Sequence, residues 1–352
     1  MSEEQLYRAK IEPIPEGEPR PLWSVMIPTY NCANYLRETL ASVLAQDPGP
    51  EIMQIEVVDD YSTHDDPAAV VQELGKGRVG FYRQEKNVGY IRNFETCLQR
   101  SRGHLLHILH GDDGVRDGFY HKLHQGFLEH PEIGAAYCRH IFMDENGHWQ
   151  RISQLEQAES GILNNALERI AVRHPIQTPS IAVRRAVYEE LGGFDRRISC
   201  SGEDWEMWVR IAARYPIWYE VEPLATYRTG ITSLSGKAVR TGKDMQDIRK
   251  AYEMILPYLP PERARELSVK IRDCWAFAAL ANAVKFLTQG EFSSMTAQIR
   301  EAINFKPSLK FFFVSVFYLS IAGAKYLTKQ TDVEKMFLEA DNKKVNSNSK
   351  AS

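Results

Sequence analysis

A carboxylate pair closes a short apolar run near residue 110. After Leu105–Leu109 and one histidine come Gly111, Asp112 and Asp113. An apolar run of this length that ends in glycine and acidic residues predicts a buried strand. Ligands bind at the carboxyl ends of strands in open α/β sheets, and carboxylate oxygens suit hard cations. We therefore expect Asp112, with Asp113 beside it, to hold a divalent metal, Mn²⁺ or Mg²⁺, that in turn holds a diphosphate.

A second acidic pair, Asp59 and Asp60, follows the apolar run 52–58. A single pair of this kind fits a turn as well as a binding site. Two acidic strand ends at one sheet edge repel each other unless a cation or hydrogen-bond donors lie between them. The second pair therefore strengthens the metal hypothesis.

A third acidic pair, Glu203 and Asp204, precedes an amphipathic segment over 205–215. Acidic side chains favour helix N-termini, where they cap free N–H groups. The same position would hold a carboxylate rigidly at the rim of a site. The sequence leaves capping and function open for this pair.

Two other patterns are typical of structure rather than of chemistry. The segment 75–80 matches G-x-G-x-x-G, but a helix precedes it and a strand follows, the reverse of the dinucleotide-binding context. It predicts a helix end and a turn, which argues against a nicotinamide enzyme.

His104, His107 and His110 recur at every third residue, and on a strand the middle one faces away from the other two. Core or supporting roles are expected for His104 and His107, while His110 stays a candidate.

The elements that must position these side chains alternate between strands and helices. Strands are predicted at 22–27, 52–58, 79–83 and 105–109, with helices at 35–46, 66–74 and 90–101. This rhythm predicts a parallel, doubly wound sheet with right-handed crossovers. Thr29 and the two acidic strand ends would then lie at the same edge of the sheet. This arrangement is typical of a nucleotide-binding α/β half. The less regular continuation is predicted as helices at 119–130, 161–173, 187–191 and 205–215 and strands at 133–143, 181–183 and 217–227.

The bulk composition is that of an ordinary globular protein. The chain has 352 residues, 43% of them hydrophobic and 25% charged, with a net charge of −3, so nothing indicates a nucleic-acid partner. Its five cysteines are scattered without a C-x-x-C pair, which favours reduced thiols in a cytoplasmic protein over a disulfide framework or a zinc site. The polar, acidic N-terminus does not resemble a secretory signal.

A hydrophobic segment lies near the C-terminus, at 309–327. Its apolar part, Phe311–Ala324, lies between Lys310 and Lys325. It is shorter than the roughly 20 residues that span a bilayer, and lysines and aromatic residues at its ends suit a membrane interface. Peripheral contact with the inner face of the cell membrane, burial in the protein or in a dimer contact, and true spanning all stay open.

Six motifs, in this order and spacing, resemble the family 2 glycosyltransferases of the GT-A fold. They cover roughly residues 22–236 and are 25–31, 57–62, 87–93, 110–113, 192–195 and 202–205. The resemblance implies an α/β fold of the GT-A type, with a doubly wound, mostly parallel sheet flanked by helices and a C-terminal helical appendage. It also implies a nucleotide-sugar donor and a glycan or lipid-linked acceptor, in cell-envelope or exopolysaccharide biosynthesis.

The resemblance, together with the composition of the two ends and the helical pattern after residue 236, divides the chain into segments. They are an irregular lead-in at 1–20, a nucleotide-sugar-binding half at 21–125, an acceptor-binding half at 126–236, a helical region at 237–338 and a disordered tail at 339–352.

The resemblance also carries residue roles. Those implied to bind the donor nucleotide are Pro28, Thr29, Tyr30, Asp59, Asp60, Asn87, Gly89, Arg92, Asp112 and Arg228. Asp59 would accept a hydrogen bond from the base, and Asp112 would be the metal-binding carboxylate. Asp204, with Glu203 beside it, would be the catalytic base of an inverting transferase, since an acceptor hydroxyl must lose its proton as it attacks.

Two departures from the family pattern favour an alternative. His110 stands where the first aspartate of the metal motif usually falls, and Gly230 stands where many relatives have histidine. The alternative is a non-catalytic nucleotide-sugar-binding relative that acts as a scaffold or regulator.

Overall fold

The computed structural model describes residues 7–230 and 234–324. Its strands are β1 (Trp23–Thr29), β2 (Met53–Asp59), β3 (Gly80–Arg83), β4 (Leu105–Ile108), β5 (Gly114–Val115), β6 (Ala135–Met143), β7 (Trp149–Ile152), β8 (Gly161–Ile162), β9 (Ile181–Arg184) and β10 (Ile217–Arg228). The helices are α1 (Ala33–Leu44), α2 (Pro67–Gly75), α3 (Tyr90–Arg100), α4 (Phe119–Glu129), α5 (Ala166–Arg173), α6 (Arg185–Leu191), α7 (Glu203–Ala212), α8 (Leu234–Thr241), α9 (Lys243–Ile255), α10 (Ala264–Thr288) and α11 (Phe292–Phe305). Two short 3₁₀ helices are η2 (Thr178–Ser180) and η3 (Leu256–Tyr258).

One mixed sheet forms the centre of the molecule. Its strand order is β3-β2-β1-β4-β9-β6-β10-β5, with β7 paired to β6 and β8 to β10. The first four strands are parallel to one another, as are β6 and β10, whereas β9 and β5 run antiparallel to their neighbours. The predicted doubly wound, mostly parallel sheet is confirmed. Because β2, β1 and β4 are adjacent and parallel, their carboxyl ends meet at one edge.

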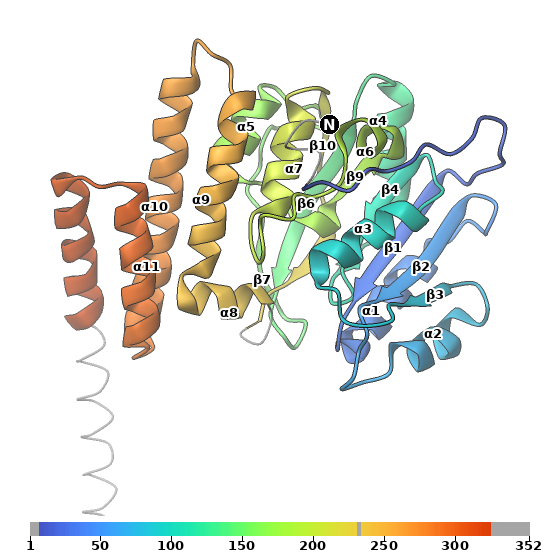
Figure 1. Ribbon diagram of the computed structural model, residues 1–352, viewed down its shortest axis with the longest axis horizontal. Coiled ribbons are helices and arrows are strands. Elements are labelled where there is room, and N and C mark those ends of the chain that lie inside the picture. Colours follow the sequence, from blue (N-terminus) through green and yellow to red (C-terminus); the bar gives the residue numbers. More distant parts are fainter. Residues whose placement is uncertain (1–6, 231–233, 325–352) are drawn as a thin grey trace, which may run out of the picture.

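Local sequence explains the helices that cover this sheet. In α1 the buried side chains Leu36, Leu40 and Val43 recur at three- and four-residue spacing, which gives the helix one apolar face. Asp66 caps α2 by accepting hydrogen bonds from the backbone of the first turn, and Pro67 begins the helix. Figure 1 shows α1, α2 and β1–β3 on one side of the molecule and α9, α10 and α11 on the opposite side.

The lead-in at 1–20 contributes to the core where it is described. Ala9 and Ile11 are buried in the main hydrophobic cluster. Arg8 forms ion pairs with Asp195, at 3.2 Å, and with Glu206 of α7, at 3.0 Å. Over residues 7–20 the segment forms no helix, and it packs as part of the folded domain.

Several predicted elements need correction. The helix predicted at 161–173 begins only at Ala166, because 161–162 pairs with β10 as β8 and Asn165 adopts a left-handed conformation. The short strands β5 and β7 were not predicted. The segment 75–80 is confirmed as a helix end and turn, since α2 ends at Gly75 and β3 begins at Gly80. His107 is fully buried beside the Tyr120 hydroxyl and the Pro179 carbonyl, in the core role predicted for it.

The C-terminal region is helical over the residues that the structure describes. Helices α10 and α11 form an antiparallel pair, and 309–324 forms a further helix beside them (Figure 1). Within the described part of the chain, no helix is long and apolar enough to cross a membrane. The predicted tail at 339–352 and the end of the segment 309–327 lie outside the described residues.

Candidate active site

The loops after β1, β2 and β4 converge at the polar sheet edge. The Gly111 amide donates to the Pro28 carbonyl at 3.0 Å, and the Asp60 amide donates to the Thr29 carbonyl at 2.9 Å. A Cβ at Gly111 would lie 2.9 Å from the Thr29 hydroxyl oxygen, so only glycine fits there without displacement. Pro28 and Thr29 are buried by this packing, whereas Tyr30 is 48% exposed. The predicted convergence of the strand ends is confirmed.

The carboxylates of Asp59 and Asp60 are both occupied by protein donors. Asp59 is fully buried and accepts a hydrogen bond from the Ser62 hydroxyl and one from the Arg83 guanidinium at 2.6 Å. Asp60 accepts from the amides of Val88, at 2.7 Å, and Gly89, at 3.0 Å. Burial nevertheless raises the pKa of Asp60 above its ordinary value.

These bonds attach the loop before α3 to the end of β2. The Asn87 side chain donates to the Asp60 carbonyl at 3.1 Å, and Gly89 begins α3 at a φ of +85°, which favours glycine. Arg92 lies exposed in the first turn of α3. Asn87 and Gly89 therefore adjoin the acidic strand ends, while Arg92 lies on the surface beside them.

His110, Asp112 and Asp113 form the group best suited to a cation. Their ligand atoms all lie within 4.8 Å of one another. Asp113 Oδ1 accepts from the Arg228 amide at 2.8 Å, and Asp113 Oδ2 lies 3.2 Å from His110 Nδ1. His110 Nε2 is buried without a hydrogen-bond partner among the described residues. Two carboxylates and an unpartnered imidazole nitrogen are a donor set that fits Mn²⁺ or Mg²⁺.

The protonation of this group reflects its burial. Burial, followed by the charge of Asp113, raises the pKa of Asp112 to about 6. Burial alone would lower the pKa of His110, but its contact with Asp113 raises it overall. A buried carboxylate pair of this kind is stabilised by a bound cation.

The Arg228 side chain supports this loop from β10. Its guanidinium donates to the Asp112 carbonyl at 2.9 Å and to the carbonyls of Asp144 and Glu145, pairs with Glu38, and lies over the Tyr35 ring. Its side chain is only 4% exposed. These contacts make Arg228 a support of the Asp112 loop rather than a ready phosphate ligand.

Glu203 and Asp204 begin α7, where several features fix the helix start. Gly202 has a φ of +91°, and a Cβ there would lie 2.8 Å from Ile248 of α9. Asp247 of α9 accepts hydrogen bonds from the amides of Ser199 and Cys200, both at 2.9 Å. The C-terminal helical region therefore fixes the loop that carries the acidic pair.

The two carboxylates of this pair have different surroundings. Burial, followed by the charge of Asp204, raises the pKa of Glu203 to about 7. Burial also acts to raise the pKa of Asp204, but His174, followed by the Trp205 amide and His110, acts against it, and the pKa of Asp204 falls below its ordinary value. No motif or spacing in the sequence marks His174.

Tyr227 of β10 is near enough to both acidic groups for their charges to act on its hydroxyl. Burial raises the pKa of its hydroxyl first, and the charges of Asp113, Asp204, Asp112 and Glu203 raise it further. The Asp112 loop and the start of α7 therefore face a common site.

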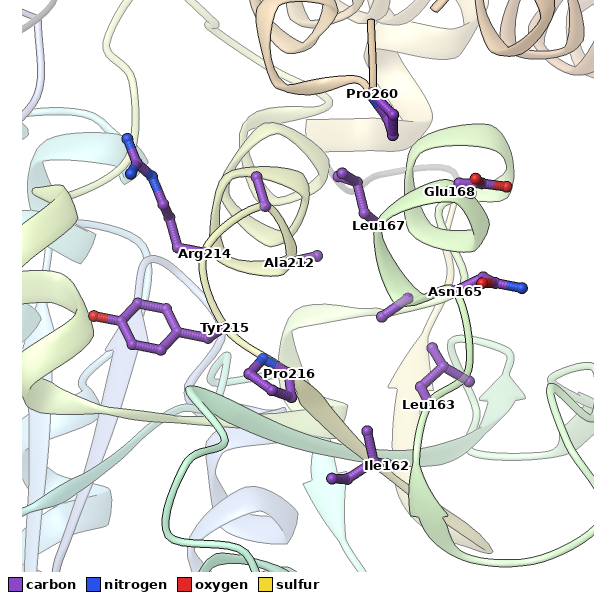
Figure 2. A pocket seen from close by; sticks show the side chains of 12 residues that line it. Ile162, Leu163, Asn165, Leu167, Glu168, Ala212, Arg214, Tyr215, Pro216 and Pro260 are labelled. Atoms are coloured by element: carbon purple, nitrogen blue, oxygen red, sulfur yellow. The ribbon is translucent and has the colours of Figure 1, made fainter. Parts of the chain in front are cut away.

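An open groove lies at the other end of α7 (Figure 2). It has a volume of about 420 Å³, and its lining includes Leu163, Leu167, Pro216 and Pro260. A helix of this length spans roughly 15 Å, so the groove is remote from the acidic pair at the N-terminus of α7.

Residues 24–192 match the profile of the family described as Glycosyl transferase family 2. These residues form a family 2 glycosyltransferase domain. This glycosyltransferase is 27% identical over 258 residues to an uncharacterised protein, MT1568, of Mycobacterium tuberculosis, covering 70% of the chain and 79% of that protein. It is 25% identical over 210 residues to the O-antigen biosynthesis protein RfbC of Myxococcus xanthus, covering 55% of the chain but only 16% of the relative.

Two solved structures share the fold of this glycosyltransferase. One is S. aureus TarS 1–349 in complex with UDP-GlcNAc, with a TM-score of 0.55 and 16% identity over 82% of this chain and 91% of that one. The other is the mannosyltransferase PcManGT of Pyrobaculum calidifontis in complex with GDP-Man and Mn²⁺, with a TM-score of 0.54 and 18% identity over 90% of this chain and 89% of that one. These matches confirm the GT-A fold expected from the sequence.

Proposed function

We propose that this glycosyltransferase moves a sugar from a nucleoside-diphosphate donor to a hydroxyl acceptor, with inversion at the anomeric carbon. The observation that supports the proposal is that the charges of both acidic groups act on the same Tyr227 hydroxyl and raise its pKa. One group, at Asp112, suits a cation and a diphosphate, and the other, at Asp204, suits a hydroxyl that must lose its proton. For a sugar to pass from a bound donor to a bound acceptor, the donor-binding group and the proton-accepting group must lie at the same site.

The residues around the donor have distinct roles in this proposal. Asp112, with Asp113 and His110, would hold a divalent metal, which neutralises charge that develops on the leaving diphosphate. Arg228 keeps the Asp112 loop in place through its bond to the Asp112 carbonyl. Thr29, Asp59 and Asp60 form the floor beneath the nucleoside, and Tyr30 flanks it. Asn87, Gly89 and Arg92 border the ribose and diphosphate.

On the acceptor side, Asp204 takes the proton of the attacking hydroxyl. The O–H bond breaks as the oxygen bonds to the anomeric carbon, and the electron pair of the broken C–O bond leaves with the diphosphate. Attack from the face opposite the leaving group inverts the configuration. The donors named in the two structural matches, UDP-GlcNAc and GDP-Man, are nucleotide sugars of this class. The RfbC match supports a role in surface-polysaccharide assembly.

Thermal unfolding with nucleoside diphosphates tests the donor site. We expect one of UDP, GDP and dTDP to raise the unfolding temperature in the presence of Mn²⁺ and to have a smaller effect without it. A ligand at 100 times its dissociation constant stabilises the folded state by about 2.7 kcal/mol, which is a shift of several degrees. If none of the three shifts the unfolding temperature with or without Mn²⁺, the donor-site proposal is wrong.

We also propose that helix 309–324 contacts an anionic membrane surface. Large apolar side chains recur at three- and four-residue spacing on its outward face: Leu309, Phe312, Phe313, Val316, Phe317 and Ile321. Phe311, on another face, is buried and packs edge-on against Phe277 of α10. Lys310 lies at the end of this apolar face, where it suits acidic lipid headgroups.

Vesicle sedimentation tests this contact. We expect the protein to pellet with vesicles that contain phosphatidylglycerol and to pellet less with pure phosphatidylcholine. Changing Phe313 and Phe317 to Asp should abolish the binding. The two charges would lie on the face of the helix that enters the membrane in our proposal, and charged groups are costly there. Changing the exposed Trp149 of β7 to Asp serves as the control. A double variant that binds as well as the wild type contradicts the proposal.

A further inference from the structure

His174 occupies a strained position at the end of α5. Its backbone is left-handed, with a φ of +47° and a ψ of 63°, a conformation that glycine and asparagine adopt more readily. A non-glycine residue there is strained, and such residues cluster at functional sites. If the residue served only to end the helix, glycine would do so without backbone strain. The presence of an imidazole at this position therefore needs an explanation.

The imidazole is directed at the proposed catalytic base. His174 Nε2 lies 3.3 Å from Asp204 Oδ2, and both side chains are 12% exposed. The ring also hydrogen-bonds to the backbone of Ile176, which fixes its orientation. The rings of Trp205 and Trp275 lie 6.4 and 6.3 Å from it, so α7 and α10 both enclose it.

Asp204 is thereby held on both oxygens. Oδ1 accepts from the Trp205 amide at 2.8 Å, and Oδ2 faces His174, with the Thr178 hydroxyl 3.5 Å away. The adjacent Glu203 has different surroundings: it interacts with the Tyr90 hydroxyl, and its Oε2 is buried without a hydrogen-bond partner among the described residues. The imidazole is therefore one of the features that distinguish the two carboxylates at this helix terminus.

We propose that His174 is a positioning residue, which pairs with Asp204 through the 3.3 Å contact between Nε2 and Oδ2 and directs the free lone pairs of that carboxylate toward the acceptor hydroxyl. This inference rests on the proposed function and adds to it a residue outside the family motifs found in the sequence. During transfer the acceptor proton moves to Asp204, and His174 neither gains nor loses a proton. The protonation states agree with this role: the pKa of Asp204 is lowered and that of His174 is raised, although burial alone would shift each the other way.

Two substitutions separate this role from simple packing. His174→Asn suits the left-handed backbone but is too short to reach Asp204, so the variant should fold and lose the contact. His174→Gln is longer and carries an N–H donor that restores the reach. Release of UDP from UDP-GlcNAc and of GDP from GDP-mannose, with Mn²⁺ present and water as acceptor, gives kcat and KM for each variant.

We expect His174→Asn to lower kcat by about 10- to 100-fold, the usual effect of misplacing a reacting group, with the donor KM within about twofold of wild type. His174→Gln should recover most of the loss. Adding His174→Asn to Asp204→Asn should cause little further loss, because the two residues act as a unit. A His174→Asn enzyme with wild-type kcat, or a loss that adds fully to that of Asp204→Asn, overturns the proposal.

The contact can also be measured without turnover. In ¹⁵N-histidine-labelled protein, the imidazole pKa of His174 should fall when Asp204 is changed to Asn, because the carboxylate is what raises it. The other groups that face His174 are Glu203 on α7 and His140 on β6, and both are unchanged in this variant. An unchanged His174 pKa overturns the proposal. If instead Asp204→Asn turns over donor like the wild type, the base assignment of the proposed function fails independently of His174.

Discussion

Replacing Asp204 by Asn is expected to lower kcat by about 10²- to 10⁴-fold, the range typical of losing a general base. Asparagine keeps the size of the side chain and accepts the Trp205 amide hydrogen bond, but it cannot take a proton. Because Asp204 does not adjoin the diphosphate in our proposal, the donor KM should stay within about twofold of wild type. Diphosphate release from UDP-GlcNAc or GDP-mannose measures both constants.

Glu203→Gln is the matched control, one residue away on the same helix turn. The pKa of Glu203 is raised to about 7, so near neutral pH its carboxyl group is partly protonated and glutamine resembles that form. We expect a loss of less than about tenfold, well short of general-base removal. If Glu203→Gln is the more damaging change and Asp204→Asn retains most of its activity, the base is Glu203 and the assignment must be reversed.

The carboxyl-terminal sheet edge was predictable because its signals are local. Each of the apolar runs before Thr29, Asp59 and Asp112 is long enough for a strand, and each ends in polar residues. Parallel pairing of neighbouring strands then follows from the helices between them. The strand at 181–183 was also predictable, but its antiparallel place between β4 and β6, as β9, depends on pairing between distant segments and has no such local signal.

The use of individual side chains was less predictable than their location. Arg228 is expected to bind the donor, and it lies beside the Asp112 loop, but its guanidinium is bound to protein acceptors on three other segments. Asp59 lies where expected, yet Ser62 and Arg83 already occupy its oxygens. Whether a polar group is free for a ligand depends on tertiary neighbours that a linear pattern does not encode.

His174 shows the same limit for a residue that was missed. It lies 30 positions before Asp204, and only the packing of α5 against α7 brings the two together. A single histidine after a helix is far more often structural than functional. The positive φ at this position is the feature that marks it, and that is visible only in the folded chain.

The Asp112 carboxylate is the least constrained of the three groups that could hold a metal. Asp113 is bound by the Arg228 amide, and His110 stacks on the Phe94 ring at 5.2 Å. Asp112, by contrast, makes no side-chain hydrogen bond to another described residue, and burial beside Asp113 raises its pKa to about 6. A carboxylate without hydrogen-bond donors of its own is stabilised most by a bound cation. We therefore expect Asp112 to contribute more to metal binding than Asp113 or His110.

Replacing Asp112 by Asn should therefore abolish the Mn²⁺-dependent part of the thermal shift caused by the preferred nucleoside diphosphate. Donor turnover should fall by at least about 10²-fold, since the charge on the leaving diphosphate would no longer be neutralised. The exposed Asp117, five residues further along the chain and just after β5, provides the control: Asp117→Asn should retain both the shift and the turnover. An Asp112→Asn protein that keeps its Mn²⁺-dependent shift would place the metal elsewhere, and the role of this strand end would have to be revised.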